Sequence, residues 1–235
     1  MLRPRNRRSG LFLKLGATEV VDIVARSGLD FAVIDLEHSQ LSEADGLRLA
    51  RHAAALGFPA LVRVPELDRG AVNRLLEAGA QGIQLSSVRS VAQVEALKAA
   101  TRYAPEGDRS VSLAHPGAAY GEVPLADYIE SQRVSPPALV VQIESAETDD
   151  PLTDVLAAGA DVAFVGTTDL AVDVELDSAR VRERVQEIAA AAAAAGVELG
   201  GFALDHPDAT YDIRGSDVAL LRTAVADHAR EHASA

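Results

Sequence analysis

The sequence predicts an α/β protein with a single-domain (β/α)8 TIM barrel, and three observations support this prediction. Short β-branched runs alternate with amphipathic segments of helical spacing. Most of the links between them are short, which favours parallel strands covered by helices. Eight such runs favour a closed barrel, and 235 residues suit one barrel. The expected strands are 11–15, 31–36, 60–64, 82–86, 139–143, 162–165, 199–203 and 218–221.

The amphipathic segments between these runs are expected to form the helices that cover the barrel. The clearest are 43–56, 69–78, 91–101 and 179–195. Ser42 and Ser90 precede two of them and are suited to cap the first free backbone N–H groups. Gly57, Gly79 and Gly196 follow three of them, where a left-handed residue ends many helices. The start and stop signals therefore agree with the helical periodicity.

One connection, between the fourth and fifth expected strands, differs from the others. It covers about 102–137, is rich in proline, and has helical spacing only over 125–132. A connection of this length inside a compact domain is usually functional or an oligomer contact. We therefore expect one barrel domain over 1–235 with a long loop insertion at about 102–137.

Composition excludes several classes of partner. The formal net charge is −13 and the pI about 4.8. A strongly acidic chain argues against nucleic acid and anionic membranes as partners, since both require a concentrated positive face. No apolar run approaches the roughly 18 residues needed to span a bilayer, and no signal-peptide pattern is evident. The cytoplasm is the expected location. There is no cysteine, which rules out disulfides and thiolate zinc sites.

The stretch F-A-V-I-D-L-E-H-S at 31–39 indicates where the site lies. It changes abruptly from apolar residues to Asp35, Glu37 and His38, as strands do where they reach an active-site edge. The ends of the other expected strands are also polar, which predicts a site on one rim of the barrel. The further residues at these ends are Lys14, Arg63, Ser86, Ser87, Gln142, Glu144, Thr167, Thr168, Asp169, Asp205 and His206.

The kinds of residue at this rim indicate a chemistry. Glu144 and Asp169 supply hard oxygen ligands, which suit Mg²⁺ or Mn²⁺, with Co²⁺ as a further candidate. Arg63 offers a planar fork for a substrate carboxylate. His38, oriented by Asp35, is a candidate acid/base near neutral pH. A metal, a carboxylate clamp and a base together suit proton chemistry beside a carbonyl.

A series of short motifs runs through nearly the whole chain and carries a family resemblance. The motifs are G-L-F-L-K-L-G, V-I-D-L-E-H-S, L-V-R-V-P, L-L-E-A-G-A-Q-G-I-Q, T-R-Y-A-P-E-G-D-R, V-V-Q-I-E-S and F-V-G-T-T-D-L-A. Their order and separations resemble the HpcH/HpaI aldolase family. Its members are metal-dependent, pyruvate-type class II aldolases, related to 2-keto-3-deoxy sugar acid and 4-hydroxy-2-oxoheptanedioate aldolases.

The resemblance implies a role for each matching residue. A divalent metal would bind to Glu144 and Asp169. His38 would be the acid/base, with Asp35 at the position of its orienting partner. Arg63 would hold the pyruvate carboxylate and enolate oxygen. Gln142 matches a residue close to the bound keto acid. The family also implies a homo-oligomer, a trimer or a hexamer.

Three departures from the family pattern bear on the substrate. Gly166-Thr167-Thr168-Asp169 replaces the frequent G-P-A-D run, and Ser86-Ser87 stand where a proline is common. The family's last strand often ends in a G-x-D-like stretch, for which the sequence indicates 220–223 instead. Ser86 and Thr168 are therefore expected to add hydrogen bonds to the substrate.

The leading functional prediction is reversible cleavage of a 4-hydroxy-2-oxo acid into pyruvate and an aldehyde, so the partners are a small 2-oxo acid and an aldehyde. Two alternatives keep the same enolate site: oxaloacetate decarboxylation and a citrate-lyase-like C–C cleavage. A third uses Lys14 as a Schiff-base nucleophile. A non-enzyme alternative is an inactive, metabolite-binding barrel, which the fold alone does not exclude. Glu37 receives no role from the sequence.

Overall fold

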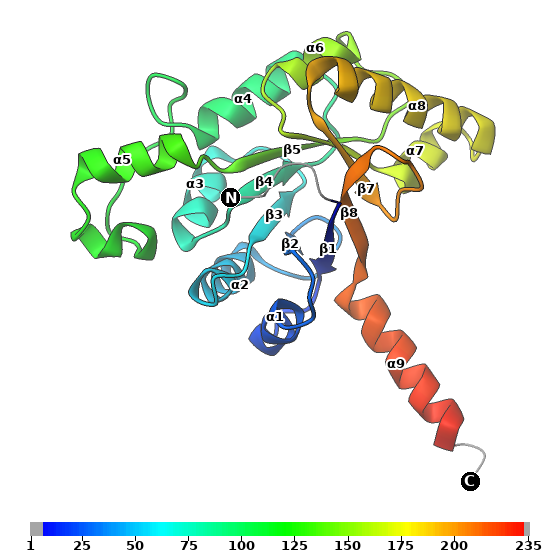
Figure 1. Ribbon diagram of the computed structural model, residues 1–235, viewed down its shortest axis with the longest axis horizontal. Helices are drawn as coiled ribbons and strands as arrows, with labels where there is room; N and C mark the ends of the chain where they lie inside the picture. Colours follow the sequence, from blue (N-terminus) through cyan, green and yellow to red (C-terminus); the bar gives the residue numbers. More distant parts are fainter. Residues whose placement is uncertain (1–6, 233–235) are drawn as a thin grey trace.

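The computed structural model describes residues 7–232 and shows a closed barrel of eight strands (Figure 1). Each strand pairs in parallel with the next, and β8 closes the barrel against β1. The predicted (β/α)8 architecture is confirmed. The strands are β1 (Arg8–Leu13), β2 (Phe31–Asp35), β3 (Ala60–Val64), β4 (Gly82–Leu85), β5 (Ala138–Ile143), β6 (Val162–Val165), β7 (Glu198–Phe202) and β8 (Ala209–Ser216).

The helices follow the strands and, with one exception, lie around the barrel (Figure 1). They are α1 (Thr18–Ala25), α2 (Glu43–Ala55), α3 (Arg69–Ala78), α4 (Val91–Thr101), α5 (Leu125–Val134), α6 (Leu152–Ala157), α7 (Thr167–Asp173), α8 (Ser178–Ala195) and α9 (Asp217–His232). The exception is α9, which extends away from the barrel. None of the helices in the described part of the chain combines the length and apolar character needed to cross a bilayer.

The eighth strand was placed wrongly by the sequence. The run 218–221 lies in α9, and the strand that closes the barrel is β8, just before it. A four-residue apolar run does not distinguish a strand from a helix. β8 was missed because Asp212, Arg214 and Gly215 interrupt its apolar pattern. The junction of β8 and α9, Gly215-Ser216-Asp217, supplies the G-x-D stretch that was expected to be replaced at 220–223.

Local signals explain the helix bounds. Ser42 and Ser90 cap α2 and α4, each through a reciprocal pair of bonds with the residue three positions later. Gly79 and Gly196 end α3 and α8 in the left-handed conformation, with φ of 114° and 70°. Gly57, also at positive φ, lies one residue beyond the cap of α2.

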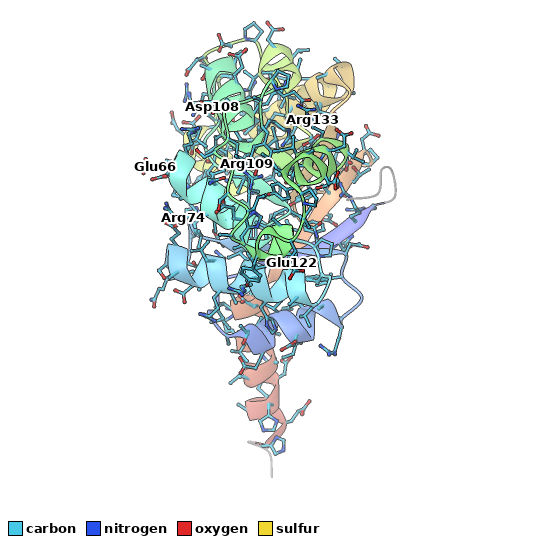
Figure 2. All side chains as sticks on the ribbon, turned by 90° about the vertical axis from the view of Figure 1, so that its left-hand side faces the viewer. Glu66, Arg74, Asp108, Arg109, Glu122 and Arg133 are labelled. Atoms are coloured by element: carbon cyan, nitrogen blue, oxygen red, sulfur yellow. The ribbon has the colours of Figure 1, made fainter. Side chains whose placement is uncertain are left out.

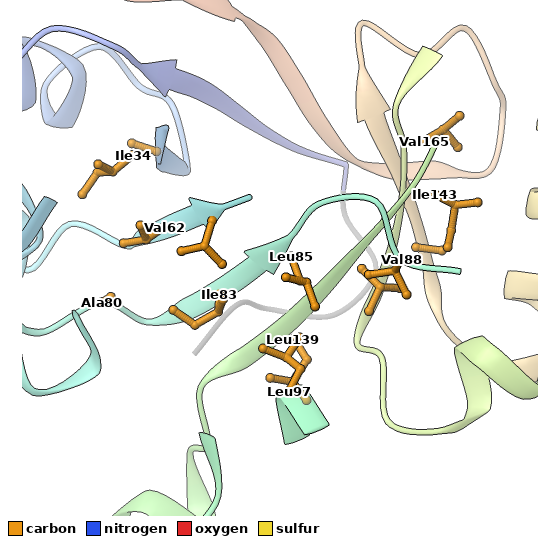
Figure 3. Packing of buried hydrophobic residues seen from close by; sticks show 14 of the residues in the cluster. Ile34, Val62, Ala80, Ile83, Leu85, Val88, Leu97, Leu139, Ile143 and Val165 are labelled. Carbon is orange, nitrogen blue, oxygen red and sulfur yellow. The ribbon is translucent and has the colours of Figure 1, made fainter. Parts of the chain in front are cut away.

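Alternation along the strands places the core and the site. One set of side chains points outward and packs under the helices, as Ile83, Leu139 and Ile143 do (Figure 3). The other set includes Phe31, Val33 and Leu61 and fills the barrel interior. Side chains along a strand alternate between the two faces, so every second residue continues this inner set. At the carboxyl ends of the strands these inward-facing residues are polar. The barrel interior therefore changes from an apolar plug to a polar rim.

The connection 102–137 folds beside α3, at the amino-terminal end of β5. It contains a 3₁₀ turn (Pro116–Gly121) and α5, whose span agrees with the expected helix over 125–132. Tyr103 and Tyr128 form a small core within it, with their hydroxyls 3.2 Å apart. Arg109 lies between α3 and α5 (Figure 2) and donates to Asn73 Oδ1 at 2.9 Å. The connection thus lies at the end of the barrel opposite the polar rim.

Candidate active site

Asp35, the last residue of β2, is the most heavily hydrogen-bonded carboxylate of the rim. Its side chain is fully buried and accepts from Arg63 Nε and Nη2 at 2.9 and 2.7 Å. β2 and β3 pair so that these two residues stand side by side. Burial alone would raise the pKa of Asp35. The hydrogen bonds and charge of Arg63, together with Lys14 and the backbone N–H of His38, outweigh burial and lower this pKa to about 2.

His38 and Glu37 follow Asp35 on the loop after β2. The backbone N–H groups of both donate to Asp35 Oδ1 at 3.1 Å. Asp35 therefore fixes the backbone of His38, while the imidazole Nε2 lies 3.8 Å from Glu37 Oε2. The same Glu37 oxygen accepts from Ser86 Oγ at 2.6 Å and lies 3.3 Å from Arg63 Nη1. Glu37, unassigned from the sequence, thus links three of the predicted residues.

Lys14 lies on the other side of Asp35. Its ammonium is 2.9 Å from Asp35 Oδ2 and donates to the His38 carbonyl at 2.9 Å. Its backbone N–H and that of Leu15 donate to the Asp217 carboxylate at 3.0 Å, which anchors the end of β1 to the end of β8. The buried Asp35 carboxylate is thus held between two cations, Arg63 and Lys14.

A second chain of polar contacts runs across β4 and β5. Gln84 Nε2 donates to Gln142 Oε1 at 2.6 Å, and Gln142 Nε2 donates to Glu144 Oε2. The other oxygen of Glu144 accepts from the backbone N–H and hydroxyl of Ser87 at 2.8 and 2.6 Å. Ser87 has a φ of 52°, which turns the chain after β4 toward Glu144. Glu144 is consequently held in one orientation.

Asp169 lies in the first turn of α7, after β6. Its carboxylate has no hydrogen bond or ion pair to any residue within 7–232, and it lines the same cavity as Glu144. Gly166 makes room for this arrangement, because a Cβ there would lie 2.6 Å from Glu144 Oε2. One oriented and one free carboxylate, without sulfur or imidazole, form a donor set that suits a hard divalent cation.

A cavity of about 320 Å³ opens at this rim. It brings together His38, Glu144 and Asp169 among the predicted residues. Asp35, Arg63, Ser86 and Gln142 lie behind these in the polar layer, and Thr168 is exposed outside the cavity. The lining residues are Glu37, His38, Ser87, Arg89, Glu144, Ser145, Asp169, Val172 and Asp173.

A larger cavity, of about 450 Å³, lies at the opposite end of the barrel. It is formed where the connection 102–137 meets the first residues of β5, β6 and β7. His115 and Arg8 line it, and it contains none of the predicted site residues. Barrel enzymes carry their catalytic groups at the carboxyl ends of the strands, so the smaller cavity is the candidate active site.

Sequence reasoning missed several contacts of this site. Gln84 stands inside a short apolar run, and its polarity at an inward position was the available signal. Asp217 was missed because β8 was placed wrongly. Arg89 and Asp173 also line the cavity. They were missed because they follow the strand ends by several residues, and the prediction considered only the residues at the strand ends.

A closed parallel barrel whose ionisable side chains gather at the carboxyl ends of its strands is the architecture of a (β/α)8-barrel enzyme. The chain belongs to the HpcH/HpaI aldolase/citrate lyase family, whose model matches residues 8–217. The resemblance predicted from the motifs is thereby confirmed.

Named relatives agree with this placement. A hydroxypyruvate/pyruvate aldolase of Paraburkholderia phytofirmans is 33% identical over 207 residues, covering 83% of this chain and 78% of that protein. A 5-keto-4-deoxy-D-glucarate aldolase of Klebsiella pneumoniae is 31% identical and covers 86% of this chain and 83% of its own. The crystal structure of a family protein from Burkholderia cenocepacia J2315 superposes with a TM-score of 0.87 at 28% identity, over 96% of this chain and 94% of that one.

Proposed function

We propose that the protein is a metal-dependent, pyruvate-type class II aldolase that reversibly cleaves a 4-hydroxy-2-oxo acid into pyruvate and an aldehyde. The observation that carries the proposal is the joint position of Glu144, Asp169 and His38 around one cavity at the barrel rim. The reaction class is supported by the relatives described above, which are named as a hydroxypyruvate/pyruvate aldolase and a 5-keto-4-deoxy-D-glucarate aldolase.

Each residue of the site has a part in this reaction. Glu144 and Asp169 would hold a divalent cation, which when bound polarises the 2-keto oxygen and stabilises the enolate. His38 takes the proton of the C4 hydroxyl as the C3–C4 bond breaks, so that C4 becomes the aldehyde carbonyl. The bond's electron pair remains on the pyruvate fragment, which is then protonated at C3 to give pyruvate.

Arg63 supplies the cationic partner of the keto acid. Two of its nitrogens are bound to Asp35 and the third, Nη1, lies 3.3 Å from Glu37 Oε2, so the guanidinium is fixed behind the cavity. We expect the enolate oxygen and carboxylate to meet the N–H groups that Asp35 does not bind, with Nη1 exchanging Glu37 for the substrate. Gln142 is held between Gln84 and Glu144, which positions its amide. We expect Ser86 to act through Glu37 rather than by direct contact, since its hydroxyl is bound there.

The proposal is tested with pyruvate alone. Wild-type protein reconstituted with Mg²⁺, Mn²⁺ or Co²⁺ should exchange the C3 protons of pyruvate with solvent deuterium, and EDTA should abolish the exchange. Exchange that persists in EDTA, with activity lost after borohydride and pyruvate, would instead favour a Schiff base on Lys14. The contacts of the Lys14 side chain with the Asp35 carboxylate and the His38 carbonyl argue against that mechanism, because a Schiff base requires an amine that is free to attack the substrate carbonyl.

The alternative reactions use the same part of the site, the part that stabilises the enolate. Oxaloacetate decarboxylation and citrate-lyase-like cleavage generate the same enolate, and the family description includes citrate lyase. Turnover of pyruvate with a panel of aldehydes, compared with release of CO₂ from oxaloacetate, separates them. We expect aldol addition to be the faster reaction.

The projecting helix α9 supports a homo-oligomer, which the family resemblance gives as a trimer or hexamer. Within the described chain α9 packs mainly against β1 and β8, and Asp217 is its only buried residue. Leu220, Leu221 and Val225 are each more than half exposed on it. An apolar helix face of this kind is suited to bury against a second copy of the chain.

Charges on α9 should therefore reduce the oligomer. The double substitution Leu220→Asp and Leu221→Asp is expected to shift the mass measured by light scattering from a trimer or hexamer to a smaller species. Arg230→Glu, at the exposed end of the same helix, is the matched control and should leave the mass unchanged. A wild-type protein that is monomeric at micromolar concentration contradicts the proposal.

A further inference from the structure

We propose that Arg89 forms an acceptor subsite that selects aldehydes carrying a negative charge, a carboxylate or a phosphate. The inference rests on the aldolase function proposed above and concerns the second substrate, which the catalytic residues leave unspecified. Arg89 lines the same cavity as His38, Glu144 and Asp169.

The backbone of Arg89 is held at this position from three sides. The preceding residue, Val88, is fully buried, and its N–H donates to the Gln142 carbonyl at 3.0 Å. The N–H of Arg89 donates to Gln93 Oε1 at 2.8 Å, and its carbonyl accepts from the Asp149 N–H at 2.8 Å. Arg89 follows Ser87, which itself binds Glu144. The residue is therefore fixed beside the metal-binding carboxylate.

The side chain of Arg89 is by contrast free to meet a substrate. It is 45% exposed, and its Nε is 3.2 Å from Oδ1 of Asp149, which is itself more exposed. An ion pair in solvent is worth little, so exchanging Asp149 for a substrate anion costs little. The guanidinium fork matches the geometry of both carboxylate and phosphate oxygens.

The charges around the cavity indicate that Arg89 determines whether an anionic aldehyde can bind there. Of the nine lining residues it is the only arginine or lysine, whereas four are carboxylates: Glu37, Glu144, Asp169 and Asp173. The metal would offset Glu144 and Asp169, and Asp173 accepts from the Ala146 N–H at 2.6 Å. Without Arg89, this end of the cavity would repel an anionic aldehyde. With it, the aldehyde carbonyl can face His38 while the charged end meets the guanidinium.

The test compares pairs of related aldehydes in which one member carries an anionic group and the other is uncharged. Succinic semialdehyde is paired with its methyl ester, and glyceraldehyde 3-phosphate with glyceraldehyde, each with pyruvate and saturating Mn²⁺. Wild-type protein should prefer the anionic member of at least one pair in kcat/KM, and the two pairs distinguish carboxylate from phosphate. In Arg89→Gln the preference should fall on the order of tenfold, mainly through KM, because a charge-assisted hydrogen bond is lost.

Three further variants make the result specific. Arg89→Lys should keep part of the preference. Asp149→Asn should keep or increase it, because the guanidinium is released. Arg26→Gln, at the exposed C-terminal cap of α1, should leave it unchanged. Equal use of charged and uncharged aldehydes by the wild type, or an undiminished preference in Arg89→Gln, overturns the subsite. Failure of the wild type to exchange pyruvate protons overturns the aldolase function and the subsite together, so the two failures are distinguishable.

Discussion

Replacing His38 by alanine is expected to lower the rate of aldol cleavage by a factor of about 10²–10⁴, the usual contribution of a positioned acid/base. The imidazole faces the cavity, and its Nε2 lies 3.8 Å from Glu37 Oε2. Because the side chain is 55% exposed, its removal leaves no cavity in the core, and stability should change by no more than about 0.5 kcal/mol. Activity and folding are thus separated in this variant.

Exposure of His38 also permits a sharper measurement. Imidazole added to His38→Ala should restore part of the lost rate, because a free base can enter the space of the missing ring. His52→Ala is the matched control: this histidine lies on α2, 3.3 Å from Asp22, and its removal should not affect turnover. Near-normal turnover of His38→Ala in the absence of imidazole shows that another group takes the C4 hydroxyl proton.

The fold was predictable because periodicity alone determines most of it. Seven of the eight strands were found from short apolar runs, since the outer and inner faces of a barrel strand are both buried. β8 was not found, because Asp212 and Arg214 interrupt its run. Asp212 is buried and lies 2.5 Å from Arg214. The sequence pattern does not show that such a charge is paired with a neighbour, so a charged residue inside a strand is read as the end of that strand.

The members of the site were predictable in the same way, but its contacts were not. Asp35, Arg63 and Glu144 stand at strand ends, where the topology brings them to one rim. Which partner each one meets depends on side-chain geometry across three or four strands. Asp35 was expected to orient the imidazole of His38, but its carboxylate contacts Arg63, Lys14 and the His38 backbone N–H instead. Its catalytic role stays a prediction.

The Asp35–Arg63 pair should be the most important ion pair for stability. Asp35→Asn leaves Arg63, whose side chain is 7% exposed, without its bidentate partner. Removing one member of a buried pair costs about 3–5 kcal/mol, because the remaining charge stays buried. We expect this loss in the free energy of unfolding measured in urea, and a loss of turnover as well, because Arg63 is no longer fixed.

An exposed pair of similar geometry provides the control for this experiment. Arg74 binds both oxygens of Glu43 at 2.5 and 3.1 Å, with about half of its side chain exposed. Glu43→Gln should cost less than about 1 kcal/mol, since solvent screens the pair. If Asp35→Asn and Glu43→Gln destabilise the protein equally, burial is not what makes the Asp35 pair strong.

Acid should remove part of the same stabilisation in the wild-type protein. The pKa of Asp35 is lowered in the folded state from its ordinary 3.8 to about 2, so the unfolded chain binds the proton first. The contribution is therefore complete above about pH 5 and is lost as the pH falls toward 2, by roughly 2 kcal/mol. Asp35→Asn has no such proton to bind. The difference in unfolding free energy between wild type and Asp35→Asn should consequently narrow over this range. A constant difference would mean that the variant loses packing rather than charge.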